Sequence, residues 1–291
     1  MKIGIGLPAA VPGVESAVIT RWARSAEARG FDALGVIDRV VFDNHEPLIT
    51  LAAAAVVTER IELLTDVLIA PIRASGLLAK QAATIDRLSG GRLTLGLGLG
   101  RRVEDFTAVG MLTDGRGRRF DQQLRDLREL WSGDRIGPAP ARPGGPPLIA
   151  AGYAPRAIDR AARLADGWCA GVGRIEQFAE NAAMLHDAWA HHGRAGRPRT
   201  LAFAYYALGP DGREATEREL SRYYAWLGEE AVDGIVATAL TEPAAIVDWL
   251  AAHADAGADE ALLMPCSPDL VQVELLADAL AGHHAIQPAA A

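Results

Sequence analysis

Residues 60–110 read RIELLTDVLIAPIRASGLLAKQAATIDRLSGGRLTLGLGLGRRVEDFTAVG, and this stretch decides the fold of the chain. An apolar run at 61–70 is followed by a helix-patterned stretch at 75–88, a Ser-Gly-Gly turn and a second apolar run at 92–97. Neither run has a polar face, which is typical of parallel strands that are buried on both sides. The connection has the length that a right-handed crossover between parallel strands requires. The stretch therefore predicts a strand–helix–strand unit.

The second strand of this unit runs into Gly96, Gly98 and Gly100. Glycine allows a backbone to approach another group closely. α/β proteins bind their ligands at the carboxyl ends of parallel strands. The glycines therefore indicate a ligand site, and the alternative is that they only pack against a helix.

Strand and helix patterns alternate along almost the whole chain, which is typical of repeated βα units. Eight strands are expected, which is the number in a TIM barrel. We predict an α/β protein with a (β/α)8 TIM barrel fold, as a single domain over residues 1–282, followed by a disordered tail at 283–291. The predicted strands are Lys2–Leu7, Ala33–Ile37, Ile61–Ile69, Arg92–Leu97, Pro147–Ala150, Gly167–Ala170, Thr200–Leu208 and Glu260–Met264.

The predicted helices carry apolar residues at three- and four-residue spacing. An insertion after the fourth strand, residues 101–118, is too long for a minimal loop and is expected to form a wall or lid of the site. The Pro- and Gly-rich segment 132–147 is interpreted as a connector on the opposite face. The predicted helices are Ala17–Arg29, Pro47–Thr58, Ser75–Leu88, Arg119–Trp131, Pro155–Leu164, Ile175–His192, Glu214–Ala239, Pro243–Ala256 and Pro268–Ala281.

Composition excludes several classes of protein. A formal net charge of −8 argues against a nucleic-acid-binding surface. The two cysteines, Cys169 and Cys266, form neither a disulfide framework nor a metal-binding spacing. The N-terminus lacks the apolar region of a signal peptide, and no apolar run reaches membrane-spanning length. We expect a cytoplasmic protein that associates with neither a membrane nor nucleic acid.

The residues expected at the carboxyl-terminal mouth of the barrel carry little catalytic equipment. They include no Ser-His-Asp set, no HExxH motif and no cluster of metal-ligating carboxylates. Among the histidines, only His45 follows a strand that could bring it to the mouth, and both cysteines are more simply interpreted as small core residues. The sequence therefore indicates that a bound cofactor carries the reaction, with no metal ion.

Three features of the mouth favour ligand binding. The Gly152-Tyr153-Ala154-Pro155 segment begins a helix without a capping side chain, which suits a phosphate group. The alternative is an ordinary strand-to-helix loop whose N–H groups face water. Asp66 interrupts an apolar run, so it either faces the mouth or forms a salt bridge with an arginine such as Arg73 or Arg101. Asp38, at the end of the second strand, likewise either pairs with a neighbouring residue or binds a ligand.

Three segments resemble the luciferase-like monooxygenase family. They are LLAKQAATIDRLSGGRLTLGLGLG, RFDQQLRDLRELWSG and PPLIAAGYAPRAIDRAARLADGWCAG, and they occur in the family's order. The resemblance covers residues 1 to about 280. It implies a (β/α)8 barrel that binds either FMN, as in the monooxygenases, or coenzyme F420, as in the oxidoreductases.

The resemblance also implies roles for individual residues. Asp66-Val67 matches the strand bulge with a non-prolyl cis peptide behind the flavin or deazaflavin ring. Gly152, Tyr153 and Ala154 match the segment whose backbone holds the cofactor phosphate. The residues expected beside the ring and its side chain are Asp38, Leu99 and Gly100.

The chain departs from the family at two positions. Arg39 stands where many F420-dependent members have His, and Arg101 stands where the sugar-phosphate dehydrogenases have Glu. These departures argue against sugar phosphate oxidation and make the mouth cationic, which suits an anionic cofactor tail or substrate. Asp38, Arg39 and Arg101 are the candidate catalytic residues.

The leading hypothesis is an F420-dependent oxidoreductase that transfers hydride between the deazaflavin C5 and a small organic substrate. The AAGY segment and the short chain favour F420 over FMN. An FMN-dependent monooxygenase that uses O2 and reduced flavin from a partner reductase is the second hypothesis. A non-catalytic protein that binds flavin or deazaflavin is the third. A homodimer is expected from the resemblance and from the Ala-rich helix TLAAAAVVT.

Overall fold

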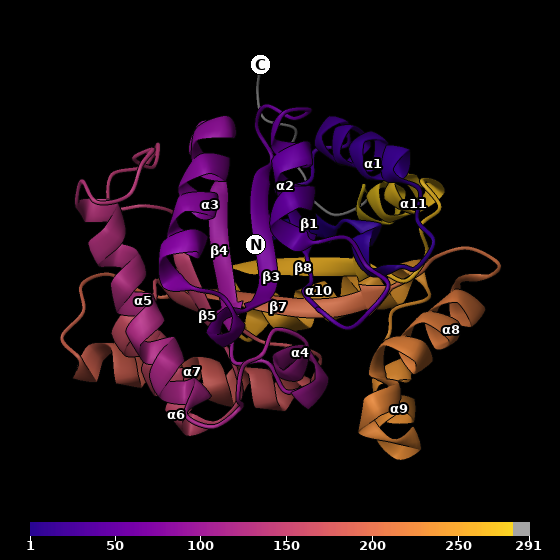
Figure 1. The fold of residues 1–291 in the computed structure, drawn as a ribbon. Helices are drawn as coiled ribbons and strands as arrows, with labels where there is room; N and C mark the ends of the chain where they lie inside the picture. Colours follow the sequence, from indigo (N-terminus) through magenta and orange to yellow (C-terminus); the bar gives the residue numbers. More distant parts are fainter. Residues whose placement is uncertain (282–291) are drawn as a thin grey trace.

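The computed structural model describes residues 1–281, and the predicted tail at 283–291 lies outside the described residues. Eight parallel strands form a closed barrel in chain order, from β1 to β8, with β8 pairing to β1 (Figure 1). The predicted TIM barrel is therefore confirmed. The strands are β1 (Lys2–Gly6), β2 (Ala33–Val36), β3 (Glu62–Ile69), β4 (Leu93–Gly98), β5 (Leu148–Ala151), β6 (Gly167–Cys169), β7 (Arg199–Tyr206) and β8 (Glu260–Pro265).

Helices surround the strands, and α4 and the α8–α9 pair lie at the same end of the barrel (Figure 1). None of the helices in residues 1–281 is both long and apolar enough to cross a membrane. The α-helices are α1 (Ser16–Ala28), α2 (Pro47–Ala55), α3 (Ser75–Leu88), α4 (Val103–Ala108), α5 (Arg116–Ser132), α6 (Pro155–Leu164), α7 (Ile175–His191), α8 (Gly212–Tyr224), α9 (Glu229–Val236), α10 (Pro243–Asp255) and α11 (Val271–Leu280).

The helix predicted at Glu214–Ala239 is wrong as a single element. The chain forms α8, then a 3-10 turn at Ala225–Leu227, then α9. Gly228 separates the turn from α9 with a φ of +87°, in the left-handed region that favours glycine and interrupts a right-handed helix. Other boundaries also differ. The 101–118 insertion contains the short helix α4 and the start of α5, which begins at Arg116 instead of Arg119. Helix α2 ends at Ala55 instead of Thr58, and the last helix begins at Val271 instead of Pro268.

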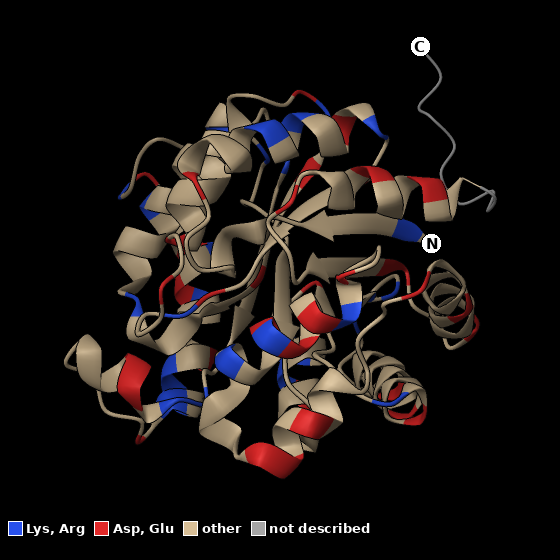
Figure 2. Ribbon diagram, turned by 90° about the vertical axis from the view of Figure 1, so that its right-hand side faces the viewer, with Lys and Arg blue, Asp and Glu red and all other residues tan. Residues whose placement is uncertain are grey.

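The outer helices pack on the barrel through small and aliphatic side chains. Helix α1 shows the pattern: Ile19, Trp22, Ala23 and Ala26 are spaced along one face and all are buried. On the outside, acidic and basic residues are interspersed along the helices in Figure 2, with no stripe of one sign in that view.

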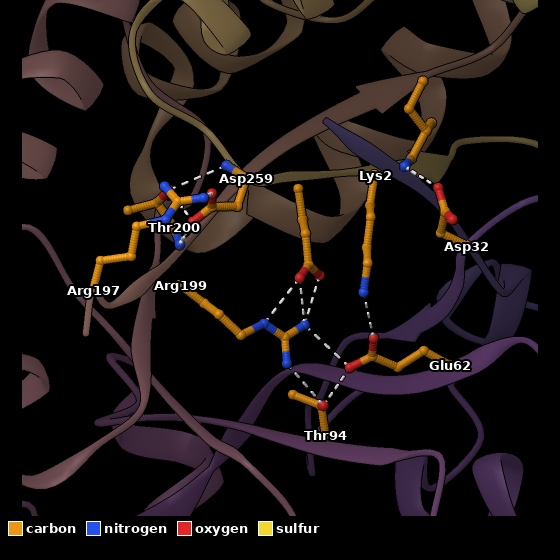
Figure 3. Close-up of polar contacts among 10 residues, drawn as sticks. Lys2, Asp32, Glu62, Thr94, Arg197, Arg199, Thr200 and Asp259 are labelled. Atoms are coloured by element: carbon orange, nitrogen blue, oxygen red, sulfur yellow. Dashed lines mark hydrogen bonds and ion pairs between the residues drawn. The ribbon is translucent and has the colours of Figure 1, made fainter. Parts of the chain in front are cut away.

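The amino-terminal end of the barrel is closed by charged side chains (Figure 3). Arg199 on β7 donates from Nε to Glu260 Oε1 at 2.9 Å and from Nη2 to Glu62 Oε1 at 3.1 Å. Thr94 donates to the same Glu62 carboxylate. A single guanidinium thus neutralises two largely buried carboxylates from β3 and β8.

Removing this guanidinium leaves two carboxylates close together, with Lys2 Nζ, 3.9 Å from Glu62 Oε2, as the remaining counter-charge. We expect Arg199→Met to lower the free energy of unfolding by about 3 kcal/mol, as for other broken buried ion pairs. The matched control is Arg197→Met, because Arg197 is 69% exposed and pairs with Asp259. Its cost should stay below about 1 kcal/mol. Urea unfolding of both variants measures the difference, and equal losses would contradict this description.

Candidate active site

Strands β3 and β4 approach each other closely and form one wall of the candidate site. A Cβ added at Gly96 would lie 1.9 Å from the Thr65 carbonyl oxygen, and one added at Gly98 would lie 2.7 Å from Val67 Cγ2. The glycines are therefore required by the neighbouring strand, and the alternative that they pack only against a helix is wrong for these two. The register of β3 on β4 shifts between Thr65 and Leu68, and the Asp66-Val67 peptide is cis, as the resemblance implied.

A cavity of about 230 Å³ opens beside this wall, at the carboxyl-terminal mouth of the barrel. We call it the main cavity. Its lining combines apolar backbone segments with one group of charged side chains and one of aromatic side chains. The charged residues are Asp38, Arg39, Asp66, Arg101, Arg102 and Asp105, and the aromatic residues are Phe203, Tyr205, Tyr223, Tyr224 and Trp226.

The main cavity brings together six of the predicted site residues, namely Asp38, Arg39, Asp66, Val67, Gly100 and Arg101. Leu99 lies on the other side of the same loop, in a second cavity. Gly152, Tyr153 and Ala154 lie outside the main cavity at the start of α6, where the Tyr153 hydroxyl donates to the Val172 carbonyl at 3.1 Å. His45, considered as a candidate, does not line the main cavity.

Asp38 is anchored through one of its two carboxylate oxygens. Its Oδ2 accepts from Arg73 Nη2 at 2.8 Å and from the Ile69 backbone N–H at 2.9 Å. Its Oδ1 is buried and has no hydrogen-bond partner among the described residues. Burial raises the pKa of Asp38 even though Arg73 opposes that shift. Asp38 therefore pairs with a neighbour and still presents one free acceptor.

Asp66 faces the cavity, and it forms no salt bridge with Arg73 or Arg101 in the part of the chain that the structure describes. Its side chain lies instead against the thiol of Cys169. Burial raises the pKa of Asp66 to about 7. Its Oδ2 is a second buried acceptor without a partner in residues 1–281. Two such atoms in one cavity are costly unless a ligand supplies donors.

The aromatic group of the main cavity was missed from the sequence. The predicted continuous helix concealed Tyr223, Tyr224 and Trp226, which the break before α9 brings over the mouth. The Tyr224 hydroxyl lies 2.9 Å from that of Tyr205 on β7. The signal was present as three aromatic residues within the four-residue stretch YYAW, in a chain with only 6% aromatic residues.

Arg39 lies among these rings. Its guanidinium carbon is 3.7 Å from the centre of the Tyr223 ring and 6.0 Å from those of Tyr224 and Trp226. Arg101 also lies beside this group, with its guanidinium carbon 5.5 Å from the centre of Trp226. Both predicted arginines therefore lie near one indole ring, in a lining that also holds Asp38, Asp66 and Asp105.

The second cavity, of about 560 Å³, lies beyond Leu99, and we call it the arginine groove. The start of α5 contributes Arg116 and Arg118, and the start of α6 contributes Arg156. Helix α6 begins without a side-chain cap, as predicted. Pro155 has no N–H and those of Ala157 and Ile158 donate to the Ala154 carbonyl, so within residues 1–281 the Arg156 N–H is the free donor of this helix start. This donor, the helix dipole and the three arginines make the groove suitable for anionic groups.

Comparison with known proteins assigns the chain to a family. The profile of the luciferase-like monooxygenases matches residues 1–261. The chain belongs to this family, and its class is that of luciferase-like oxidoreductases on a TIM barrel.

The relatives of the chain use different cofactors. It is 34% identical to an F420-dependent glucose-6-phosphate dehydrogenase of Beutenbergia cavernae, over 61% of this chain and 58% of that protein. It is 25% identical to an FMNH2-dependent dimethylsulfone monooxygenase of Pseudomonas putida, over 73% of this chain and 63% of that protein. The structure of monooxygenase RslO1 from Streptomyces bottropensis superposes with a TM-score of 0.82 at 22% identity, over 98% of each chain.

The environment of Asp66 predicts a pH dependence of stability. The pKa of about 7 in the folded state exceeds the value of about 3.9 in an unfolded chain, so the unfolded state loses this proton first. The free energy of unfolding should therefore fall as the pH rises from about 4 to about 7, and this effect should level off above pH 7. Between pH 5 and pH 8 the fall from this residue is roughly 2–3 kcal/mol.

Asp66→Asn should remove that part of the pH dependence, because the amide does not titrate. Urea unfolding at pH 5 and pH 8 measures it, with Asp255→Asn at an exposed position of α10 as the control. A variant whose pH dependence equals that of the unmodified chain would show that Asp66 is not held in this environment.

Proposed function

We propose that the chain is an F420-dependent oxidoreductase that acts on a small organic substrate at the mouth of the barrel. When bound, F420 would supply a carbon centre, the deazaflavin C5, that accepts or donates hydride. The protein supplies orientation, exclusion of water and hydrogen-bond partners. The expected homodimer, and a reductase that supplies hydride, stay predictions.

The residues of the main cavity fit a flavin or deazaflavin ring. The two unpartnered acceptors, Asp38 Oδ1 and Asp66 Oδ2, require hydrogen donors, which the N–H groups of such a ring carry. The bulge at Asp66-Val67 is the surface against which we place the ring. The tyrosines and Trp226 on the opposite wall would exclude water from the reacting atoms.

The observation that carries the choice of F420 is the arginine groove. F420 differs from FMN in a tail that continues beyond its phosphate with further carboxylates. A groove with Arg116, Arg118 and Arg156, separated from the main cavity only by the loop at Leu99, suits that tail. None of these three arginines forms an ion pair with a carboxylate in residues 1–281.

Equilibrium binding to the purified protein without cofactor tests this proposal. We expect F420 to bind with a micromolar or lower Kd and at least tenfold more tightly than FMN, because only F420 fills both cavities. Fluorescence titration or calorimetry measures both constants. Micromolar binding of FMN without binding of F420 would overturn the proposal and favour the FMN-dependent monooxygenase. If neither cofactor binds, the hypothesis of a non-catalytic binding protein is excluded as well.

The arginine groove makes a second prediction. The double variant Arg118→Gln/Arg156→Gln should weaken F420 binding about tenfold, since each exposed charge contributes up to about 1 kcal/mol. FMN, which ends at one phosphate, should be affected less. Arg21→Gln, an exposed arginine on α1, is the control and should change neither constant. Equal weakening of F420 and FMN would show that the groove does not hold the tail.

A further inference from the structure

The charged residues that line the main cavity are not all paired with one another. Arg102 lies 3.7 Å from Asp105, whose carboxylate also accepts from the backbone N–H groups of Val40 and Val41. Asp38 is paired with Arg73, which lies outside the main cavity. Arg39 and Arg101 are left without a carboxylate partner, and Asp66, the remaining acid of the lining, forms an ion pair with neither of them among the described residues.

Of the two, Arg39 is the more unusual. It is only 8% exposed, whereas Arg101 is open to solvent. No carboxylate oxygen of the described residues lies within 4.0 Å of its guanidinium. Glu219 acts on Arg39 only from beyond ion-pair distance, so the guanidinium has no anion in contact with it among the described residues. A largely buried cation is stabilised when an anion binds to it directly.

The surroundings of Arg39 hold it in place and leave part of it free. Its flat guanidinium lies 3.7 Å from the centre of Tyr223, and Phe42 lies 5.2 Å away. Ring faces attract a cation, but they supply no acceptor in the guanidinium plane. Arg39 also lines the main cavity, so it can reach a ligand there. The fork of N–H groups matches the two oxygens of a carboxylate.

We propose that Arg39 binds the carboxylate of the substrate, and that the substrate is a small unsaturated acid with a flat apolar body. The body would lie against Tyr224 and Trp226, and Arg101 at the rim would attract the anion as it enters. This inference deepens the proposed function and rests on it for the reaction, but binding of the carboxylate can be tested separately.

The probes are trans-cinnamate and trans-cinnamamide, which differ only in charge at one end. Calorimetry on the F420-loaded protein should give at least tenfold tighter binding of cinnamate. Arg39→Gln should remove this preference, while Arg39→Lys should retain part of it. The control is Arg174→Gln, an exposed arginine just before α7 that does not line the main cavity, and it should retain all of it.

The outcomes separate this inference from the proposed function. Equal binding of the two probes, no binding of cinnamate, or an unchanged preference in Arg39→Gln would overturn the inference, even if F420 binds. A cinnamate preference that depends on Arg39 in protein that does not bind F420 would uphold it and overturn the cofactor proposal. If Arg39→Gln does not fold, two measurements test the inference instead. They are the preference of the unmodified chain for cinnamate over cinnamamide and the partial retention of that preference in Arg39→Lys.

Discussion

The close approach of β3 and β4 is the constraint on which the rest of the site depends. Without side chains at Gly96 and Gly98, strand β4 leaves room for the Thr65 carbonyl and for the Val67 side chain. The bulge at Asp66-Val67 can therefore stay inside the barrel wall while Asp66 faces the main cavity. An alanine at Gly96 would place its Cβ 1.9 Å from a backbone oxygen, which no side-chain movement relieves. Sterics at one strand pair thus determine where a ligand can lie.

The loop after β4 divides the mouth into two sites of different chemistry. On one side, the main cavity is lined by apolar, aromatic and charged side chains, and burial raises the pKa values of Asp38 and Asp66. On the other side, the arginine groove has more arginines than carboxylates in its lining, with two helix N-termini beside it. A ligand with a flat ring and an anionic tail matches both. The net charge of −8 for the whole chain gives no hint of this local excess of arginine.

Most of the barrel could be predicted from the sequence, because each buried parallel strand is a continuous apolar run such as ELLTDVLI, with a helix period on either side. Asp38, Arg39 and Arg101 could also be found, since they come after predicted strands, and Asp66 could be found because it interrupts an apolar strand. The aromatic group of the main cavity could not be predicted, because the sequence of Glu214–Ala239 keeps a helical pattern across Gly228. The contact partners of the two aspartates could not be predicted either, because only the folded chain brings Arg73 to Asp38 and Cys169 to Asp66.

A crystal structure of the complex with F420 is the most direct test of this account. We expect the deazaflavin ring in the main cavity, between Val67 and the tyrosines, with Asp38 Oδ1 in hydrogen-bond contact with it. The phosphate should lie at the start of α6, and the tail should follow the arginine groove. A ring that lies outside the main cavity, or a tail that leaves the mouth away from Arg118 and Arg156, would contradict it.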